Sequence, residues 1–235
     1  MTQETTQSSI RAPRRRTDPA GGHWTFSGRK RTAIIIGAGA RGNSIFAELM
    51  RTRECGWELA GVVEPHEGRR GAFRERHHLP ADRVFDSIAQ LLPRPRLADF
   101  VFICTPDVTH YDLCVAVSSA GYDVLLEKPI ATTLADCLAL IDVQKTHGNH
   151  IFVAHVLRYS PFFRALRDLI RSGEYGSVRG LQLTEMVGHW HFAHSYVRGN
   201  WRRRDLSAPL GLTKSSHDLD IITWLLADER VTHVS

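Results

Sequence analysis

Short apolar runs alternate with longer amphipathic stretches from residue 32 to about residue 156. The apolar runs are bounded by glycine, proline and charged residues, as buried strands are, and helical stretches separate them. The predicted strands span Thr32–Gly37, Glu58–Val63, Val84–Phe85, Phe100–Ile103, Val124–Leu126 and Ile151–Val156. The predicted helices span Arg41–Arg53, Glu67–His77, a short segment ending at Leu92, Thr109–Ala120 and Leu134–Thr146. This alternation predicts an α/β fold with a doubly wound parallel sheet.

The pattern changes after residue 157. The expected elements are a helix over Pro161–Arg171, a partly alternating antiparallel strand over Val178–Val187, and a helix over His217–Ala227 capped by Ser215. One strand and two helices cannot close a core alone. We therefore expect residues 158–235 to be an incomplete α+β domain, cut off at its carboxyl end, after a complete domain over residues 31–157.

Charge and composition narrow the class of protein. The 235 residues carry a net charge of +5, but residues 1–31 hold seven basic and two acidic residues, so the remainder is neutral. Residues 1–30 have no periodicity and are predicted to be a disordered basic arm. No apolar run approaches a membrane span. The four cysteines form no Cys-x-x-Cys pair, which favours a reduced, cytoplasmic protein without a disulfide framework.

A glycine-rich turn joins the first predicted strand to the first helix. Its pattern, G-x-G-x-x-G, places Gly37 at the tight turn, Gly39 where the backbone approaches a pyrophosphate, and Gly42 where helix and strand pack. The helix start at Ala40 and Arg41 offers free N–H groups to phosphates. The motif in this context predicts a Rossmann nucleotide-binding domain.

Glu64 ends the second predicted strand, 22 residues after Gly42. A carboxylate there accepts hydrogen bonds from the adenosine ribose hydroxyls and repels a 2′-phosphate, so NAD is the expected cofactor. Arg69 and Arg70 follow closely and are able to face a 2′-phosphate, so NADP stays possible.

Two further segments carry a family resemblance. T-P-D-V-T-H at residues 105–110 and E-K-P at residues 127–129, together with the glycine turn, resemble the glucose–fructose oxidoreductase / inositol dehydrogenase (Gfo/Idh/MocA) family over about residues 31–230. The resemblance implies oxidation or reduction of sugars, inositols and related polyols with NAD or NADP. It also implies homo-oligomers of the full-length protein. The residues it places near the cofactor are Thr105, Pro106, His110 and Glu127.

Lys128 is the first catalytic candidate. The chain has 26 arginines but four lysines, and this lysine stands at the carboxyl end of a parallel strand, where such sheets bind ligands. The resemblance implies that Lys128 binds the reacting oxygen and that the Lys128–Pro129 bond is cis. Glu127 either orients Lys128 or is structural.

His217 is the acid/base candidate. At the expected start of the last helix, the helix dipole would favour neutral imidazole. Asp220, one turn later, is expected to hold the ring or a substrate hydroxyl. The family pattern often has Asp four residues before this histidine, where Thr213 stands here. Lys214 is therefore a second candidate for the substrate oxygen.

The remaining candidates line a substrate site. His155 and Arg158 follow the sixth predicted strand, and Trp201 lies in a loop rich in His and Trp that we expect to cover the substrate. His189, His191 and His194 have no compact ligand spacing, so no metal is expected.

Two functions stay open at this point. The first is an NAD(P)-dependent dehydrogenase that acts on a hydroxyl group of a polyol. The second is a non-catalytic protein of the same fold that senses NAD(P) or a sugar. Nucleic-acid binding has only the basic arm in its favour, and neither nucleic acid nor a membrane is an expected partner.

Overall fold

The computed structural model describes residues 28–51, 55–199, 201–203, 205, 207–227 and 229–234. The predicted disordered arm therefore lies almost wholly outside the described residues, as do Asn200 and Arg204. The six predicted strands are all present, with ends that differ by up to three residues. They are β1 (Arg31–Ile36), β2 (Trp57–Val63), β3 (Val84–Phe85), β4 (Phe100–Ile103), β5 (Asp123–Leu126) and β6 (Ile151–Val153).

The strands form one parallel sheet in the order β3-β2-β1-β4-β5-β6. This is the strand order of a dinucleotide-binding Rossmann fold, so the predicted doubly wound sheet is confirmed. Ile36, the last residue of β1, lies opposite Val63 of β2 and Ile103 of β4. The turns that follow these strands therefore meet at the carboxyl edge of the sheet.

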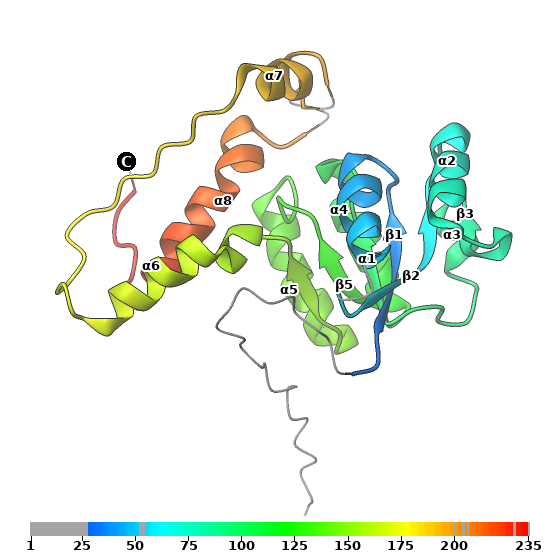
Figure 1. Cartoon of the computed structure of the whole chain (residues 1–235), viewed down its shortest axis with the longest axis horizontal. Helices are drawn as coiled ribbons and strands as arrows, with labels where there is room; N and C mark the ends of the chain where they lie inside the picture. Colours follow the sequence, from blue (N-terminus) through cyan, green and yellow to red (C-terminus); the bar gives the residue numbers. More distant parts are fainter. Residues whose placement is uncertain are drawn as a thin grey trace, which may run out of the picture.

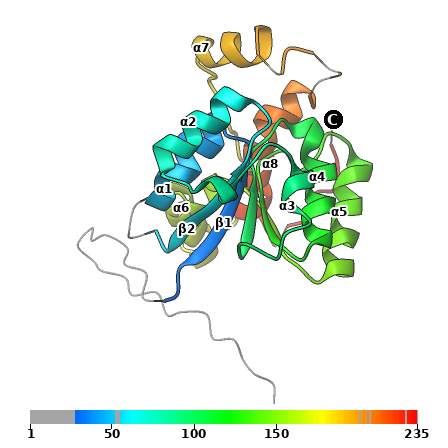
Figure 2. The ribbon, with the colours of Figure 1, turned by 90° about the vertical axis from the view of Figure 1, so that its right-hand side faces the viewer.

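Helices cover both faces of the sheet. One face carries α1 (Glu48–Arg51) and α2 (Glu67–His77), and the other carries α3 (Ile88–Leu91), α4 (His110–Ser119) and α5 (Leu134–His147), as Figure 2 shows. Alternate residues of β1 enter the two cores: Ile34 and Ile36 face one, Ala33 and Ile35 the other. Burial on both faces explains why these strands read as continuous apolar runs.

Three helices follow the sheet: α6 (Pro161–Ser172), α7 (His189–Phe192) and α8 (Leu210–Leu225). Helix α6 lies beside α8 (Figure 1). Between them, the Arg167 guanidinium lies 4.3 Å from the ring centroid of Trp224. Among the described residues, no helix combines the length and apolar character needed to cross a bilayer.

The strand predicted over Val178–Val187 is wrong. Residues 178–188 are extended without strand pairing (Figure 1). Most of their side chains are exposed. A strand is held by hydrogen bonds to a neighbouring strand, and none of the described residues provides one here. The described part of residues 158–235 consists of helices joined by extended links.

Candidate functional site

The glycine turn has the geometry that a dinucleotide requires. Gly37 has a φ of +97°, which favours glycine. A Cβ on Gly42 would lie 2.1 Å from the carbonyl oxygen of Gly37, whereas one on Gly39 would meet nothing within 4 Å. The space over Gly39 is thus open at the amino end of the helical turn Ala40–Ala47, which has no side-chain cap. These residues fit a bound pyrophosphate.

Glu64 is buried at the end of β2 and its carboxylate organises this turn. Oε2 accepts a hydrogen bond from the Ala38 amide at 2.9 Å, and Oε1 accepts bonds from the His66 amide and the Arg69 guanidinium, each at 2.9 Å. Burial alone would raise the pKa of Glu64, but these three hydrogen bonds hold it below its usual value. Arg70 donates to the carbonyl of Glu64 at 2.8 Å. Contact between Glu64 and a ribose stays a prediction.

His110 ties two loops together at the carboxyl edge. Its Nδ1 lies 2.8 Å from the carbonyl oxygen of Pro129, and its Nε2 lies 3.1 Å from that of Thr105. The side chain is 1% exposed. His110 therefore positions the loop that starts at Thr105 and Pro106, a role that sequence reasoning missed. Its two ring nitrogens are already occupied, so this geometry does not support the expected contact with a cofactor.

Arg41 and Glu127 pair with each other across the same edge. The Arg41 Nε atom lies 3.0 Å from Oε1 of the buried Glu127, and the other carboxylate oxygen accepts a bond from the Lys128 amide at 3.2 Å. Both residues were expected near the cofactor; Arg41 lies in the helical turn after β1 and Glu127 directly follows β5, so both stand at the carboxyl edge of the sheet. The Lys128–Pro129 peptide bond is cis, as the resemblance implied.

Lys128 reaches from the end of β5 to α8. Its Nζ atom donates a hydrogen bond of 2.7 Å to the carbonyl oxygen of Thr213, a residue 85 positions later. Burial lowers the pKa of Lys128; Glu127 acts against this, and the charge of Lys214 adds to it. A lysine with a lowered pKa at a strand end suits the binding of a polar oxygen.

Helix α8 begins earlier than predicted. Its first residue is Leu210 and its N-cap is Pro209, so Ser215 lies inside the helix and caps nothing. His217 is consequently in the third turn of the helix. The expectation that the helix dipole keeps His217 neutral is wrong, because that effect fades within the first turn.

His217 nevertheless has a strongly lowered pKa, for a different reason. Burial and the positive charge of Lys128, with His155 nearby, reduce the pKa of His217 to about 4. The ring centroids of His155 and His217 lie 5.9 Å apart, in an edge-to-face arrangement. Lys128 therefore lies close enough to His217 for its charge to act on the ring. The sequence did not reveal that this charge and burial would lower the pKa of His217.

Asp220 has partners other than those expected. Instead of holding the His217 ring, its buried carboxylate lies 3.0 Å from Nδ1 of His155 and accepts two hydrogen bonds from Arg158. The side chain of Asp220 is turned to the segment after β6, so it holds the neighbouring imidazole. His155 and Arg158 were predicted near the site and lie in it, but no local pattern could pair them with Asp220.

Lys214 also has a partner that sequence reasoning missed. Its Nζ atom lies 2.7 Å from Oε1 of Glu185, which stands in the extended segment 178–188. Asp218 lies one turn further along α8, and burial together with the negative charge of Glu185 raises the pKa of Asp218. The sequence offered no signal for Glu185, because the segment was expected to be a strand of a different sheet.

Asp107 and Tyr196 both hold helix α8 in place. The buried Asp107 carboxylate accepts a hydrogen bond of 2.9 Å from the Ala208 amide, just before α8. The Tyr196 hydroxyl contacts the Thr213 hydroxyl at 3.2 Å. The Asp107 contact holds the start of α8 against the carboxyl edge of the sheet, and the Tyr196 contact holds α8 to the segment that follows α7. Asp107 lies in the T-P-D-V-T-H segment, but only its partner shows its role.

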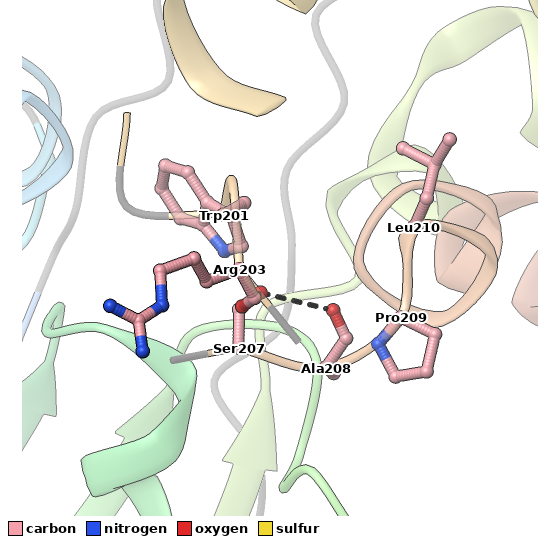
Figure 3. A pocket seen from close by; sticks show the side chains of 6 residues that line it. All are labelled: Trp201, Arg203, Ser207, Ala208, Pro209 and Leu210. Atoms are coloured by element: carbon pink, nitrogen blue, oxygen red, sulfur yellow. Dashed lines mark hydrogen bonds between the residues drawn. The ribbon is translucent and has the colours of Figure 1, made fainter. Parts of the chain in front are cut away.

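Trp201 lies at the side of this arrangement. It lines an open pocket of about 390 Å³ beside the first turn of α8 (Figure 3). The pocket is lined by Trp201, Arg203, Ser207, Ala208, Pro209 and Leu210. None of the catalytic candidates is part of this lining, so the substrate contact predicted for Trp201 stays a prediction. His189 is the first residue of α7, and His191 lies in the same helix. Within the described residues no group of three His, Cys, Asp or Glu side chains is arranged to hold a metal ion.

Comparison with known proteins agrees with the nucleotide-binding fold. The sequence model of the Gfo/Idh/MocA oxidoreductases, described as an oxidoreductase family with an NAD-binding Rossmann fold, matches residues 31–155. An inositol 2-dehydrogenase of Corynebacterium glutamicum (strain R) is 29% identical over 205 residues, which are 85% of this chain and 55% of that protein. The chain spans about half the length of the curated relatives it matches.

Two solved structures share the fold. The WlbA dehydrogenase from Bordetella pertussis, in complex with NADH and UDP-GlcNAcA, has a TM-score of 0.71 at 21% identity, covering 84% of this chain and 60% of that one. The aldose-aldose oxidoreductase from Caulobacter crescentus has a TM-score of 0.70 at 21% identity, covering 85% and 58%.

Proposed function

The chain belongs to the Gfo/Idh/MocA family of oxidoreductases with an NAD-binding Rossmann fold, and from this we propose that it transfers a hydride between a nicotinamide cofactor and a sugar, an inositol or a similar polyol. The reacting group is a hydroxyl that becomes a carbonyl, or the reverse. Relatives named as inositol 2-dehydrogenases and a neighbour that binds a sugar nucleotide support this substrate class.

The contact between Lys128 and α8 carries the proposal. Lys128 stands at the carboxyl edge, just after β5, and β4 separates β5 from β1, the strand that leads into the glycine turn. Its ammonium is bound to the Thr213 carbonyl, one helical turn before His217. A cation and an imidazole thus lie together where open parallel sheets bind their ligands. In the proposed reaction Lys128 binds the reacting oxygen, the imidazole of His217 or of the neighbouring His155 acts as acid/base, and Lys214 is a second group for that oxygen.

The cofactor site fits the same reaction. When bound, the nicotinamide supplies hydride transfer. The open space over Gly39 and the uncapped helical turn at Ala40 would hold the pyrophosphate, and Glu64 would face the ribose. Glu64 favours NAD, whereas Arg69, which already pairs with Glu64, gives NADP a positive partner.

Burial supports a role for Lys128 as more than a surface charge. Burial leaves the Lys128 ammonium poorly solvated, and this lowers its pKa. A poorly solvated cation interacts strongly with an oxygen that develops negative charge as its proton leaves. Removing it should therefore slow the chemical step more than it weakens binding.

The experiment uses the purified chain. NADH and NADPH are titrated by fluorescence, and a panel of inositols, aldoses and sugar acids is then screened at the nicotinamide absorbance band. Lys128→Met is compared with Lys145→Met, a matched change at an exposed lysine on α5. We expect cofactor binding, turnover of at least one polyol, and a fall in turnover of about a hundredfold or more for Lys128→Met alone.

Other outcomes separate the alternatives. Cofactor binding without turnover of any substrate, with Lys128→Met equal to wild type, contradicts the enzyme and supports the sensing protein. Tighter binding of NADPH than NADH would assign Arg69, not Glu64, the dominant role. Homo-oligomer formation, expected from the resemblance, belongs to this proposal and is read from light scattering of the same sample.

A further inference from the structure

The site holds two imidazoles, and only one has an orienting partner. Nδ1 of His155 lies 3.0 Å from Oδ1 of Asp220, whose side chain is 7% exposed. The same carboxylate is fixed by Arg158, with 2.8 Å between Nε and Oδ2. By contrast, Nδ1 of His217 is buried and has no hydrogen-bond partner among the described residues.

The Asp220 contact determines the tautomer of His155. A carboxylate only accepts hydrogen bonds, so the neutral ring carries its proton on Nδ1 and leaves the lone pair on Nε2. No described residue forms a hydrogen bond to this Nε2. A base held by an acceptor, with its other nitrogen free, is the arrangement that activates histidine in acid/base catalysis.

His155 also lies at the reacting end of the site. It follows β6, the neighbour of the strand that ends before Lys128, and the charge of Lys128 acts on its ring. Its ring is edge-to-face with His217 at 5.9 Å between centroids. The His155 side chain is 19% exposed, so a substrate can reach it.

We propose that His155, oriented by Asp220, is the catalytic base, and that His217 binds the substrate beside it. This rests on the proposed function. In the oxidation, the substrate O–H bond breaks and the proton bonds to Nε2 of His155. The carbon–hydrogen bond breaks with its electron pair, which passes as hydride to the oxidised nicotinamide, and the C=O bond forms. Lys128 holds the oxygen throughout.

The charges around the two rings agree with this assignment. His155 faces Asp220, Arg158 and Lys128; burial lowers its pKa, and the negative charge of Asp220 acts against the lowering. His217 faces Lys128, His155, Glu185 and Arg41, and its pKa falls to about 4. A base is most effective when its pKa is near the working pH, and His155 alone has a contacting carboxylate that raises it.

The first test compares matched variants of the whole chain. His155→Gln should lower kcat about a hundredfold or more with little change in KM, whereas His217→Gln should mainly raise KM. Asp220→Asn should lower kcat at least about tenfold and shift the pH profile. The control is a second Asp–His pair, at the opposite edge of the sheet: His150→Gln and Asp123→Asn, whose Nδ1 and Oδ1 atoms lie 3.4 Å apart, should equal wild type.

The second test does not require activity. Nitrogen-15 NMR of the histidine rings reports the tautomer of His155 and the pKa of both histidines. We expect the Nδ1–H tautomer for His155, a higher pKa for His155 than for His217, and loss of this tautomer preference in Asp220→Asn. The Asp123→Asn variant should leave the His155 signals unchanged.

The outcomes are distinguishable. An Nε2–H tautomer in the wild type, or full turnover by His155→Gln beside an inactive His217→Gln, overturns the assignment of His155. A wild type that binds NADH, shows the expected tautomer and turns over no polyol overturns the proposed function and with it the catalytic role. The Asp220–His155 pair would then be purely structural.

Discussion

Two glycines of the nucleotide turn should respond oppositely to the same added methyl group. In Gly42→Ala the new Cβ would lie 2.1 Å from the Gly37 carbonyl oxygen and 2.9 Å from Cγ2 of Ile35. The first atom belongs to the backbone, so relief requires β1 and the following helical turn to separate. Overpacking of this kind costs ~1–3 kcal/mol and sometimes more. We expect ~3 kcal/mol, which lowers Tm by about 6–12 °C for a domain of this size.

In Gly39→Ala the same group meets nothing within 4 Å, and Gly39 has a φ of −72°, which alanine adopts without strain. The folded chain should keep its Tm or gain a few degrees, since alanine restricts the unfolded chain by ~0.4–1 kcal/mol. The open space is where the pyrophosphate approaches. NADH affinity should therefore fall about tenfold or more, equivalent to ~1.4 kcal/mol.

Thermal unfolding followed by circular dichroism measures the first effect, and fluorescence titration with NADH measures the second. Gly71→Ala is the matched control, because Gly71 lies exposed in α2 and an added Cβ would meet nothing within 4 Å. This variant should lower neither the Tm nor the affinity for NADH. A Gly42→Ala protein that melts with wild type would refute the close approach of β1 and the helical turn. A Gly39→Ala protein with wild-type NADH affinity would refute the path assigned to the pyrophosphate.

Two further predictions concern stability. The folded pKa of His217, about 4, is below its ordinary value of 6.5, so the unfolded chain takes up the proton first as the pH falls. The free energy of unfolding should therefore be highest above pH 6.5 and decline towards pH 4, and the decline should be smaller in His217→Gln. Urea unfolding across this pH range measures both. Asp107→Ala removes the acceptor of the buried Ala208 amide and should cost ~1–3 kcal/mol in the free energy of unfolding; an unchanged urea midpoint would mean that this bond does not hold α8.

The sequence predicted the nucleotide-binding sheet well because its signals are local. A parallel strand covered on both faces must be apolar throughout, so β1 and β4 stand out as uninterrupted runs. The glycine turn is likewise contained in six consecutive residues. The prediction of a strand over Val178–Val187 was wrong for a different reason. Alternating apolar and polar residues indicate that an extended segment has two different faces, but only hydrogen bonds to a neighbouring strand make that segment part of a sheet.

The start of α8 was misplaced for a related reason. Ser215 with Asp218 three residues later imitates a capping box, although both lie inside the helix. The true start follows Pro209, next to Ala208, whose amide is held by a side chain 101 residues earlier. A local motif cannot report such a contact.

The same limit decides what could be said of the site. Sequence reasoning named Lys128, His217, His155 and Asp220 individually, since each has a suitable chemistry and lies near a strand end or on the last helix. It paired Asp220 with His217 because they are one turn apart, whereas the folded chain pairs Asp220 with His155, 65 positions away. Which residues contact each other matters more for the chemistry of this site than which residues belong to it. A carboxylate next to an imidazole decides which nitrogen is free to take a proton, and an imidazole next to a lysine loses basicity. Two histidines that look equivalent in the sequence therefore become, in the folded chain, one oriented base and one weakly basic ring.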